Sequence, residues 1–442
     1  MKSLLLRGED KNRWERRTAL VPEDLKAILE KTGTRAFVES SPKRIFTESQ
    51  YRQAGAKICD SMAPGEVIFG IKEIPEEKIL DARIYLFFSH TIKGQPANMG
   101  LLRKIIDSGS TLIDYERIVA KDGRRIVFFG RYAGDAGAID ILSLLGEHWA
   151  SRGLVTPLAD IKRAHEYASV AAARAHIKEV GGAIRREGFP GELAPFTVGI
   201  LGYGNVSQGS QQILDCLPTQ RVAPGEIAPR LEGGQLDAHT VYVTVFKEED
   251  LVASTSGSAF SLEEYFQHPE CYASVFDAYL PYYTILINAV YWESRYPRFV
   301  TWEGLEALYR DAPSPKLQGI ADITCDTHGS VECNVRSTDT DMPAYQVDPL
   351  TRKVADGHTG DGIVLLAVDN LPCELPHDAS TFFSGQLAPL VPGILGADYS
   401  QPLKESGLAP EVQNAVVVYN GRLTPDYAYL QACLEAEETP QA

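Results

Sequence analysis

Short apolar runs of strand length recur along the chain and alternate with segments of helical spacing. In the first part of the chain these runs occupy residues 3–6, 35–38, 67–71, 84–88 and 111–113. Strands that are apolar almost throughout are typical of parallel sheets covered by helices on both faces, because neither face meets solvent. The pattern therefore predicts an α/β fold with mostly parallel sheets.

The length of 442 residues fits two domains of ordinary size. Residues 137–149 have helical spacing and predict a long helix that leads out of the first sheet. A second sheet starts near Phe196, and we expect the apolar segment 380–395 to be a helix that crosses back, with its end left open by Pro392 and Gly393. We therefore expect two Rossmann-like domains, linked by long helices around a central cleft. The first domain is predicted at residues 1–140, completed by 380–442, and the second at 141–379.

Charge and hydropathy exclude two classes of partner. The net charge is −16, and no stripe of Lys and Arg is available to follow a phosphate backbone, so we expect no nucleic acid partner. No window reaches the roughly 20 apolar residues that a membrane span needs, so we expect no membrane partner.

The cysteines indicate the compartment. There are seven, an odd number, and none forms a CxxC pair. This usage favours reduced thiols in a cytoplasmic protein over a disulfide framework or a metal site.

Several predicted strands of the first domain end in side chains capable of chemistry. Arg7, Lys72 and His90 follow three of them, and the segment 114–116 follows a fourth. In open α/β sheets the ligand crevice lies at the carboxyl ends of the strands, so these side chains are candidates for a site. The alternative for each residue is an ordinary polar strand end.

One segment has the pattern of a dinucleotide-binding loop. The apolar strand 196–201 runs into Gly202 and Gly204, which permit a tight turn and a close approach of a pyrophosphate. The following residues open a helix whose N-terminus favours negative charge. Ser207 replaces the third glycine of the usual pattern, and Gly209 comes two residues later. The alternative is a simple strand-to-helix turn.

The next strand predicted after this loop and helix is the apolar run 241–246, which bears on the choice of dinucleotide. It ends in Lys247 and Glu248. An acidic residue at such a strand end holds the ribose hydroxyls of NAD, whereas a basic residue accommodates the 2′-phosphate of NADP. Because both signs are adjacent, the segment leaves the choice open.

The motifs also carry a family resemblance. The segment 13–22, RWERRTALVP, resembles the N-terminal signature of the alanine dehydrogenase and saccharopine dehydrogenase superfamily. The block 87–102 resembles lysine–2-oxoglutarate reductases more specifically. Further similar segments are 204–207, 286–293 and 368–372. The resemblance covers nearly the whole chain, and it places the saccharopine-cleaving half of the bifunctional members beyond the last residue.

The resemblance implies an oxidoreductase of lysine metabolism that acts on a CH–NH bond. The ε-amine of L-lysine condenses with the keto carbon of 2-oxoglutarate, and hydride reduces the imine to saccharopine in a reversible reaction. The implied cofactor is NADPH/NADP, with NADH/NAD left open. A separate saccharopine-cleaving dehydrogenase is the implied partner.

The resemblance also assigns residues. Lys72 and His90 match the acid–base pair of the fungal enzymes; a Lys acts as base only when burial or nearby cations lower its pKa, and His titrates near neutrality. The implied substrate-binding residues are Arg17, Gln95, Arg125 and Asp322. From their charges we also expect Glu73 and Glu116 in the substrate site, where they balance and tune the acid–base pair. The implied cofactor-binding residues are Arg124, Gly202, Gly204, Asn205, Val206, Ser207, Tyr291, Asp369, Asn370 and Leu371.

Other interpretations of the residues remain. Without the resemblance, Lys72 reads as a solvated surface lysine and His90 as a hydrogen-bonded residue at a sheet edge. The rival functions are an NAD(P)-dependent amino-acid or opine-type dehydrogenase with a different amine, and a non-catalytic nucleotide-binding regulator.

Overall fold

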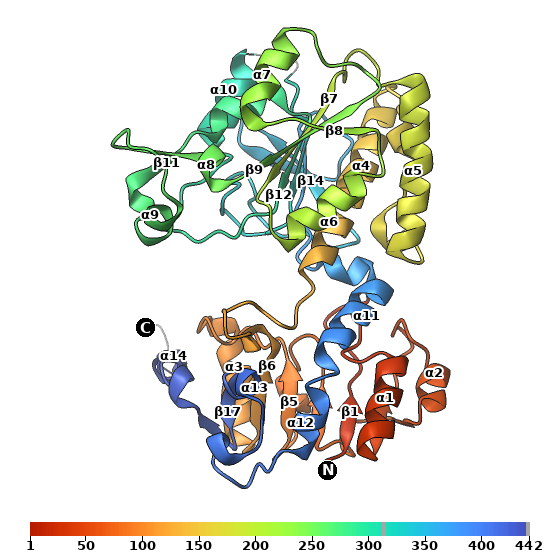
Figure 1. The fold of residues 1–442 in the computed structure, drawn as a ribbon, viewed down its shortest axis with the longest axis vertical. Helices are drawn as coiled ribbons and strands as arrows, with labels where there is room; N and C mark the ends of the chain where they lie inside the picture. Colours follow the sequence, from red (N-terminus) through yellow and green to blue (C-terminus); the bar gives the residue numbers. More distant parts are fainter. Residues whose placement is uncertain (312–314, 439–442) are drawn as a thin grey trace. The chain divides into compact units, whose positions relative to one another are not determined.

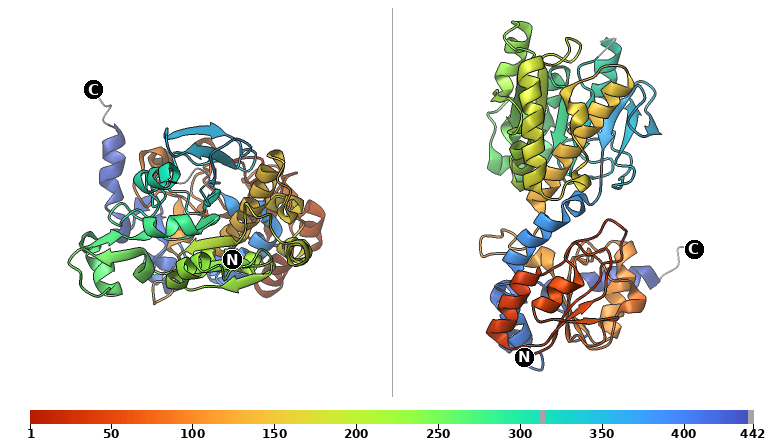
Figure 2. Two further views of the ribbon diagram at one scale, coloured as in Figure 1. Left: turned by 90° about the horizontal axis from the view of Figure 1, so that it is seen from above. Right: turned by 90° about the vertical axis from the view of Figure 1, so that its right-hand side faces the viewer.

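The computed structural model describes residues 1–311 and 315–438, which form two compact units (Figures 1 and 2). The first unit contains Met1–Phe129 and the segment that starts at Pro376, and the second contains Gly130–Leu375. The predicted boundaries at 140/141 and 379/380 fall inside two helices, α4 (Gly130–Ser151) and α11 (Pro376–Leu387). Both helices start where the two units meet, and the amino-acid composition does not change at their first residues. The sequence therefore does not mark these boundaries.

The first unit is built on an eight-stranded sheet in the order β18-β17-β6-β5-β4-β1-β2-β3. Strands β1 to β6 are parallel, and β17 joins β6 antiparallel. Central β1 pairs on both sides, with Leu5 opposite Phe37 and Ile68. The strands are β1 (Leu4–Leu6), β2 (Ala36–Glu39), β3 (Lys57–Cys59), β4 (Val67–Phe69), β5 (Ile84–Phe87), β6 (Thr111–Asp114), β17 (Val416–Tyr419) and β18 (Arg422–Leu423).

The helices of the first unit come from both ends of the chain. They are α1 (Pro22–Thr32), α2 (Glu48–Gln53), α3 (Met99–Asp107), α11, α12 (Val391–Gly396), α13 (Pro410–Gln413) and α14 (Leu430–Glu438). Helix α11 holds the N-terminal part of the unit in place, since the hydroxyls of Ser380 and Ser384 accept the backbone N–H groups of Thr18 and Val21.

The predicted helical segment 380–395, whose end the sequence left open at Pro392, contains the greater part of α11 and then α12. Pro392 lies in the first turn of α12. Proline is tolerated there, but inside a continuous helix it would remove a hydrogen bond and clash with the preceding turn. Helix α11 therefore ends at Leu387, and a new helix, α12, begins at Val391, one residue before Pro392.

The second unit also contains an eight-stranded sheet, in the order β15-β14-β16-β13-β12-β7-β9-β8. Strands β14 and β15 are antiparallel additions, and the other six strands are parallel. The strands are β7 (Phe196–Leu201), β8 (Thr219–Arg221), β9 (Val241–Phe246), β12 (Ile285–Asn288), β13 (Gly319–Asp322), β14 (Ala344–Asp348), β15 (Lys353–Asp356) and β16 (Ile363–Leu366). A separate hairpin joins β10 (Val252–Ser254) and β11 (Tyr272–Ser274). The predicted α/β class with mostly parallel sheets is confirmed.

Helices lie on both faces of this sheet, with α4, α5 and α6 on one side and α7, α8 and α10 on the other (Figure 1). They are α4, α5 (Val170–Glu187), α6 (Asn205–Leu214), α7 (Pro224–Glu232), α8 (Glu248–Leu251), α9 (Leu262–Gln267) and α10 (Trp302–Asp311). Helix α4 buries residues around its whole circumference, as expected of a helix enclosed by protein. In the described residues, no helix is long and apolar enough to cross a membrane.

Candidate active site

The first sheet reverses its strand order between β1 and β4. From β1 the chain adds β2 and β3 on one side, then β4, β5 and β6 on the other. Ligands of open α/β sheets bind outside the carboxyl ends of the strands at such a reversal. Arg7 and Glu9 follow β1 at this point, and Lys72 and Glu73 follow β4.

Arg7 and Glu9 hold the backbone that carries Lys72. The carboxylate of Glu9 accepts the N–H groups of Ile71 at 2.7 Å and Lys72 at 3.0 Å. Nη1 of Arg7 donates to the carbonyls of Lys72 and Glu73, each at 3.4 Å. Burial raises the pKa of Glu9, while the Arg7 charge opposes this shift. The sequence patterns did not assign a site role to Glu9.

His90 lies three residues beyond the end of β5 and is held by an acidic neighbour. Its Nδ1 lies 2.5 Å from Oε1 of Glu73, whose other oxygen lies 3.5 Å from Nζ of Lys11. Burial acts to raise the pKa of Glu73, but the hydrogen bond to His90 and the nearby cations lower it to about 2. His90 has a φ of +52°, which is rare for residues other than glycine and clusters at functional sites. The side chain of Asn98 donates to the His90 carbonyl at 3.0 Å.

Lys72 and His90 come from neighbouring strands, since β4 and β5 are paired. Both side chains are partly exposed, so both can reach a ligand at this edge of the sheet. The structure thus places both residues of the predicted acid–base pair, together with Glu73, beyond the carboxyl ends of β4 and β5. Their roles stay predictions.

A buried network supports the end of β5 from behind. Asp114, the last residue of β6, accepts the Ser89 backbone N–H at 3.1 Å and also the Ser89 hydroxyl. It accepts the backbone N–H of Glu116 at 2.8 Å as well. Burial raises the pKa of Asp114, against the effect of these donors. The network fixes the residue that precedes His90.

Arg17 is nearly fully buried and forms a two-point ion pair with Glu15. Its Nε and Nη2 lie 2.8 and 2.5 Å from the two Glu15 oxygens. The guanidinium also stacks over Phe129, with 4.2 Å between Cζ and the ring centroid. Arg17 is therefore held rigidly in one orientation.

The other predicted residues of this unit lie on exposed segments. Arg125 forms an ion pair with Glu116, and its side chain is half exposed. Arg124 pairs with Asp122 at 3.1 Å in a turn, and its side chain is 81% exposed. Gln95 is exposed and precedes a short 3-10 helix. Arg125 and Gln95 are thus accessible to a ligand. Arg124 lies in a solvated turn directly after Gly123.

In the second unit, the strand order reverses between β7 and β12, and the glycine loop follows β7. Gly202 has a φ of +92°, and a Cβ there would lie 3.0 Å from the Ala289 carbonyl, so the turn requires glycine. A Cβ on Gly204 would meet no described atom within 4 Å, which leaves open space in front of α6. Gly204 is the N-cap of α6 and no side chain caps this end in the described structure, so its backbone N–H groups suit a phosphate.

Ser207 and Gly209 lie on the buried side of α6, away from the open space at Gly204. The Ser207 hydroxyl accepts the Gln211 side chain at 2.9 Å. A Cβ on Gly209 would overlap the Arg131 carbonyl and lie 2.8 Å from the backbone nitrogen of Asp135. Gly209 therefore permits close packing of α6 against α4.

Asp322 ends β13 in a buried polar network and is 1% exposed. It accepts the Asn288 and Asn334 amides at 2.8 Å each and the Thr324 hydroxyl at 2.7 Å. Burial raises the pKa of Asp322, and these donors oppose the shift. In this structure Asp322 fixes the carboxyl ends of β12 and β13 relative to each other.

The remaining predicted cofactor residues differ in exposure. Tyr291 is 76% exposed, and Asp369 is exposed too. Leu371 is buried beside Gly137 of α4, and Asn370 is mostly buried. Tyr291 and Asp369 are accessible to a ligand, whereas Leu371 packs in the core.

One prediction about the strand sequence changes. The strand that follows α6 in the chain is β8, a three-residue strand, and not β9. Its sequence, TQR, is polar and half exposed, so it carries no apolar signal. Because β9 nevertheless pairs with β7, Lys247 and Glu248 still follow the strand adjacent to the glycine loop.

Known proteins resemble this chain over both units. Residues 5–136 match the alanine dehydrogenase/PNT N-terminal domain. This N-terminal part of the chain is therefore similar to that domain. The predicted resemblance to the alanine dehydrogenase and saccharopine dehydrogenase superfamily is confirmed.

Relatives extend the match along the chain. The mitochondrial alpha-aminoadipic semialdehyde synthase of Rattus norvegicus is 36% identical over 99% of this chain. The chain spans about half of that relative, 48% of its length. The Candida glabrata saccharopine dehydrogenase [NAD(+), L-lysine-forming] is 28% identical over 88% of this chain and 90% of its own. A solved L-alanine dehydrogenase shares the fold, with a TM-score of 0.62 and 18% identity over 98% of this chain and 99% of its own.

Proposed function

We propose that this protein catalyses the reductive condensation of L-lysine with 2-oxoglutarate to saccharopine, with a nicotinamide cofactor as hydride donor. The observation that carries the proposal is the group formed by Lys72, His90 and Glu73 at the strand-order reversal of the first sheet. The extended similarity to alpha-aminoadipic semialdehyde synthases supports it.

The substrates of this reaction bring three carboxylates, and the first unit offers arginines to bind them. Arg17 is oriented by Glu15 and Phe129, and the half-exposed Arg125 is paired with Glu116 at the surface. Arginine binds carboxylates at two points because its guanidinium is a planar fork. In this proposal Arg17 and Arg125 bind substrate carboxylates, while Gln95 contributes an amide donor.

Imine formation requires proton transfers at two atoms. The lysine ε-nitrogen loses protons as it adds to the keto carbon, and the carbinolamine oxygen gains a proton before it leaves as water. We assign these transfers to Lys72 and His90. Glu73 binds Nδ1 of His90, so Nε2 is the ring nitrogen left to exchange protons with the substrate. The hydrogen bonds from Arg7 and Glu9 hold the Lys72 backbone in place beside His90 during these steps.

The second unit fits a nicotinamide dinucleotide. The open space at Gly204, the left-handed Gly202 and the N-terminus of α6 suit the pyrophosphate. Asn205 and Val206 supply first-turn N–H groups, and the exposed Tyr291 and Asp369 lie on loops accessible to the cofactor. The bound cofactor supplies the hydride that reduces the imine carbon.

We infer a preference for NADPH from the end of β9. Lys247 is exposed there, with Nζ 3.9 Å from Glu249 in a weak surface pair, and its charge is available to a 2′-phosphate. The Tyr203 hydroxyl hydrogen-bonds to the Glu248 carboxylate, and burial together with this carboxylate raises the pKa of that hydroxyl. The Glu248 carboxylate, which would repel a 2′-phosphate, is therefore engaged by Tyr203 of the glycine loop.

The test is an absorbance assay of cofactor oxidation with purified protein, lysine, 2-oxoglutarate and either NADPH or NADH. We expect lysine-dependent oxidation and formation of saccharopine, confirmed by mass spectrometry. Ornithine, alanine and ammonia serve as alternative amines. Faster turnover with one of these than with lysine would reassign the substrate, and no amine-dependent oxidation with either cofactor would refute the proposal.

A further inference from the structure

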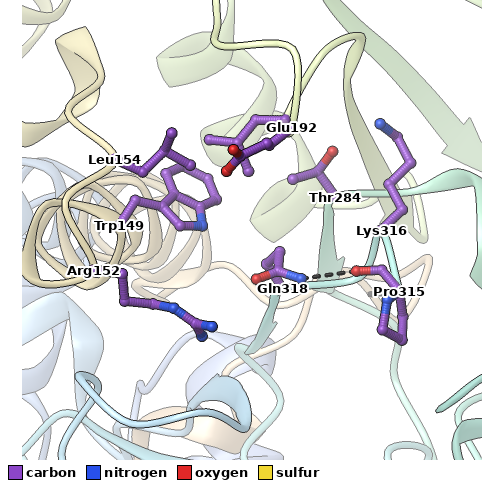
Figure 3. A pocket seen from close by; sticks show the side chains of 9 residues that line it. Trp149, Arg152, Leu154, Glu192, Thr284, Pro315, Lys316 and Gln318 are labelled. Atoms are coloured by element: carbon purple, nitrogen blue, oxygen red, sulfur yellow. Dashed lines mark hydrogen bonds between the residues drawn. The ribbon is translucent and has the colours of Figure 1, made fainter. Parts of the chain in front are cut away.

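The second unit has a pocket of about 440 Å³ at the amino ends of its strands (Figure 3). Its wall comes from the loops that precede β7, β12 and β13, and from the C-terminal end of α4. The glycine loop follows β7 and therefore lies at the carboxyl ends of the parallel strands, whereas the pocket lies at their amino ends. The volume falls in the range of small-molecule sites. Nothing in the proposed reaction uses this pocket.

Among the described residues, one buried cation of the pocket lacks a counter-charge and one buried donor lacks an acceptor. Lys316 is mostly buried and donates to the Pro195 carbonyl, but no carboxylate of the described chain pairs with it. Trp149 is 2% exposed, and its indole Nε1 has no hydrogen-bond partner in the described structure. Burying a cation without a counter-charge, or a donor without an acceptor, costs free energy, so such groups indicate a missing anion.

The rest of the wall has both a second cation and a carboxylate. Arg152 is half exposed, with its nearest acid, Asp361, 3.5 Å away. The exposed Glu192 carries the one carboxylate of the lining, and in Figure 3 it faces the same space as Trp149 and Leu154. Leu193 adds a further apolar surface.

We propose that this pocket binds a free α-amino acid with an apolar side chain, as an effector site separate from the catalytic machinery. The ligand carboxylate accepts from Lys316, Arg152 and the Trp149 indole. The ligand ammonium pairs with Glu192. The apolar side chain packs against Trp149, Leu154 and Leu193, so each group of the ligand meets a group already in the wall.

The test is calorimetric titration of the full chain with L-leucine and L-phenylalanine, beside 4-methylpentanoate, which lacks the ammonium, and inorganic phosphate. We expect an amino acid to bind, and Lys316→Met to weaken it by about tenfold or more, since a lost charged hydrogen bond costs that much. Trp149→Phe keeps an aromatic ring but removes the indole N–H, and should weaken binding several-fold. Lys353→Met, at an exposed strand of the same unit, is the matched control and should leave binding unchanged.

Each other outcome has a consequence. Equal binding of 4-methylpentanoate would overturn the assignment to an amino acid, and tighter binding of phosphate would overturn it as well. No binding of either amino acid to the wild-type protein would refute the site. Because binding is measured directly, these results do not depend on whether the protein forms saccharopine, and far-UV circular dichroism verifies that the variants fold.

A pH series gives a second test. Burial lowers the pKa of Lys316 to about 8, so the ammonium loses its proton as the pH rises past that value. The other charged groups at the pocket are Arg152, with its partner Asp361, and Glu192. We expect the affinity for the amino acid to fall as pH rises through 8 in wild type and to depend less on pH in Lys316→Met. Equal pH dependence in both would contradict the role of Lys316.

Discussion

The Nδ1 atom of His90 lies 2.5 Å from the Oε1 atom of Glu73, and the two residues follow adjacent strands of one sheet. A carboxylate at Nδ1 fixes the orientation of the imidazole and selects Nε2 as the nitrogen that meets a ligand. The same carboxylate connects His90 to the segment that carries Lys72. The two proposed acid–base groups are therefore positioned through one shared side chain.

The first prediction concerns stability in acid. The pKa of Glu73 is about 2 in the folded protein, below its ordinary value of 4.5. A lowered folded pKa stabilises the protein above the ordinary pKa, and this contribution is lost as the pH falls from about 4.5 to 2. Glu73→Gln should thus be less stable at pH 7 by about 3 kcal/mol. The difference should shrink towards pH 3, measured by urea unfolding at both values. A difference that stayed constant with pH would contradict the shift.

The second prediction concerns Lys72. Lys72→Met should lower kcat by about a hundredfold to ten-thousandfold, the range for removal of an acid–base group. The thermal midpoint and the dissociation constant of the reduced cofactor should change little. Lys57→Met, on exposed β3, is the control and should retain full turnover. Full turnover in Lys72→Met would remove the residue from the mechanism.

The third prediction separates two arginines. Arg17→Gln breaks a buried ion pair, so it should lose about 3–5 kcal/mol of stability as well as substrate affinity. Arg125→Gln breaks an exposed pair and should cost at most about 1 kcal/mol of stability. It should still raise the KM for 2-oxoglutarate by about tenfold. Steady-state kinetics and thermal melts on both variants give the comparison, and an unchanged KM in Arg125→Gln would exclude Arg125 from substrate binding.

The fourth prediction contrasts two glycines of one helix. Gly204→Ala adds a methyl group in open space at a φ of −72°, so the thermal midpoint should hold while the KM for the cofactor rises several-fold. Gly209→Ala drives a methyl group into the α4 backbone and should cost about 1–3 kcal/mol or more. The reverse pattern, with Gly204→Ala unstable and its cofactor KM unchanged, would show that the loop does not approach the pyrophosphate.

The sequence predicts this site unevenly, for physical reasons. Lys72 and His90 were found because each follows an apolar run and lies in a recognisable motif. Glu9 was not assigned, since its role depends on β1 lying beside β4, which no local pattern encodes. Gly209 resembles a displaced fingerprint glycine, yet its function is helix packing. Leu371 lies in a motif and is nonetheless a core residue.

The fold was predictable where it depends on local pattern. Buried strands such as β7 are apolar throughout and show this in any window of the sequence. Strand β8 is short and polar, so pairing with β9 defines it and composition does not. The break between α11 and α12 was left open by the sequence because Pro392 is compatible with both a helix end and a helix start.

The antiparallel pairing of β17 with β6 determines when the first unit can finish folding. During synthesis the ribosome releases residues 1–129 first, and the strand that covers the edge of β6 emerges some 300 residues later. Until then the nascent sheet has an unpaired edge that can join a neighbouring chain. The continuous second unit can fold in the interval, so chaperone dependence and aggregation during expression should be properties of the unit that begins the chain.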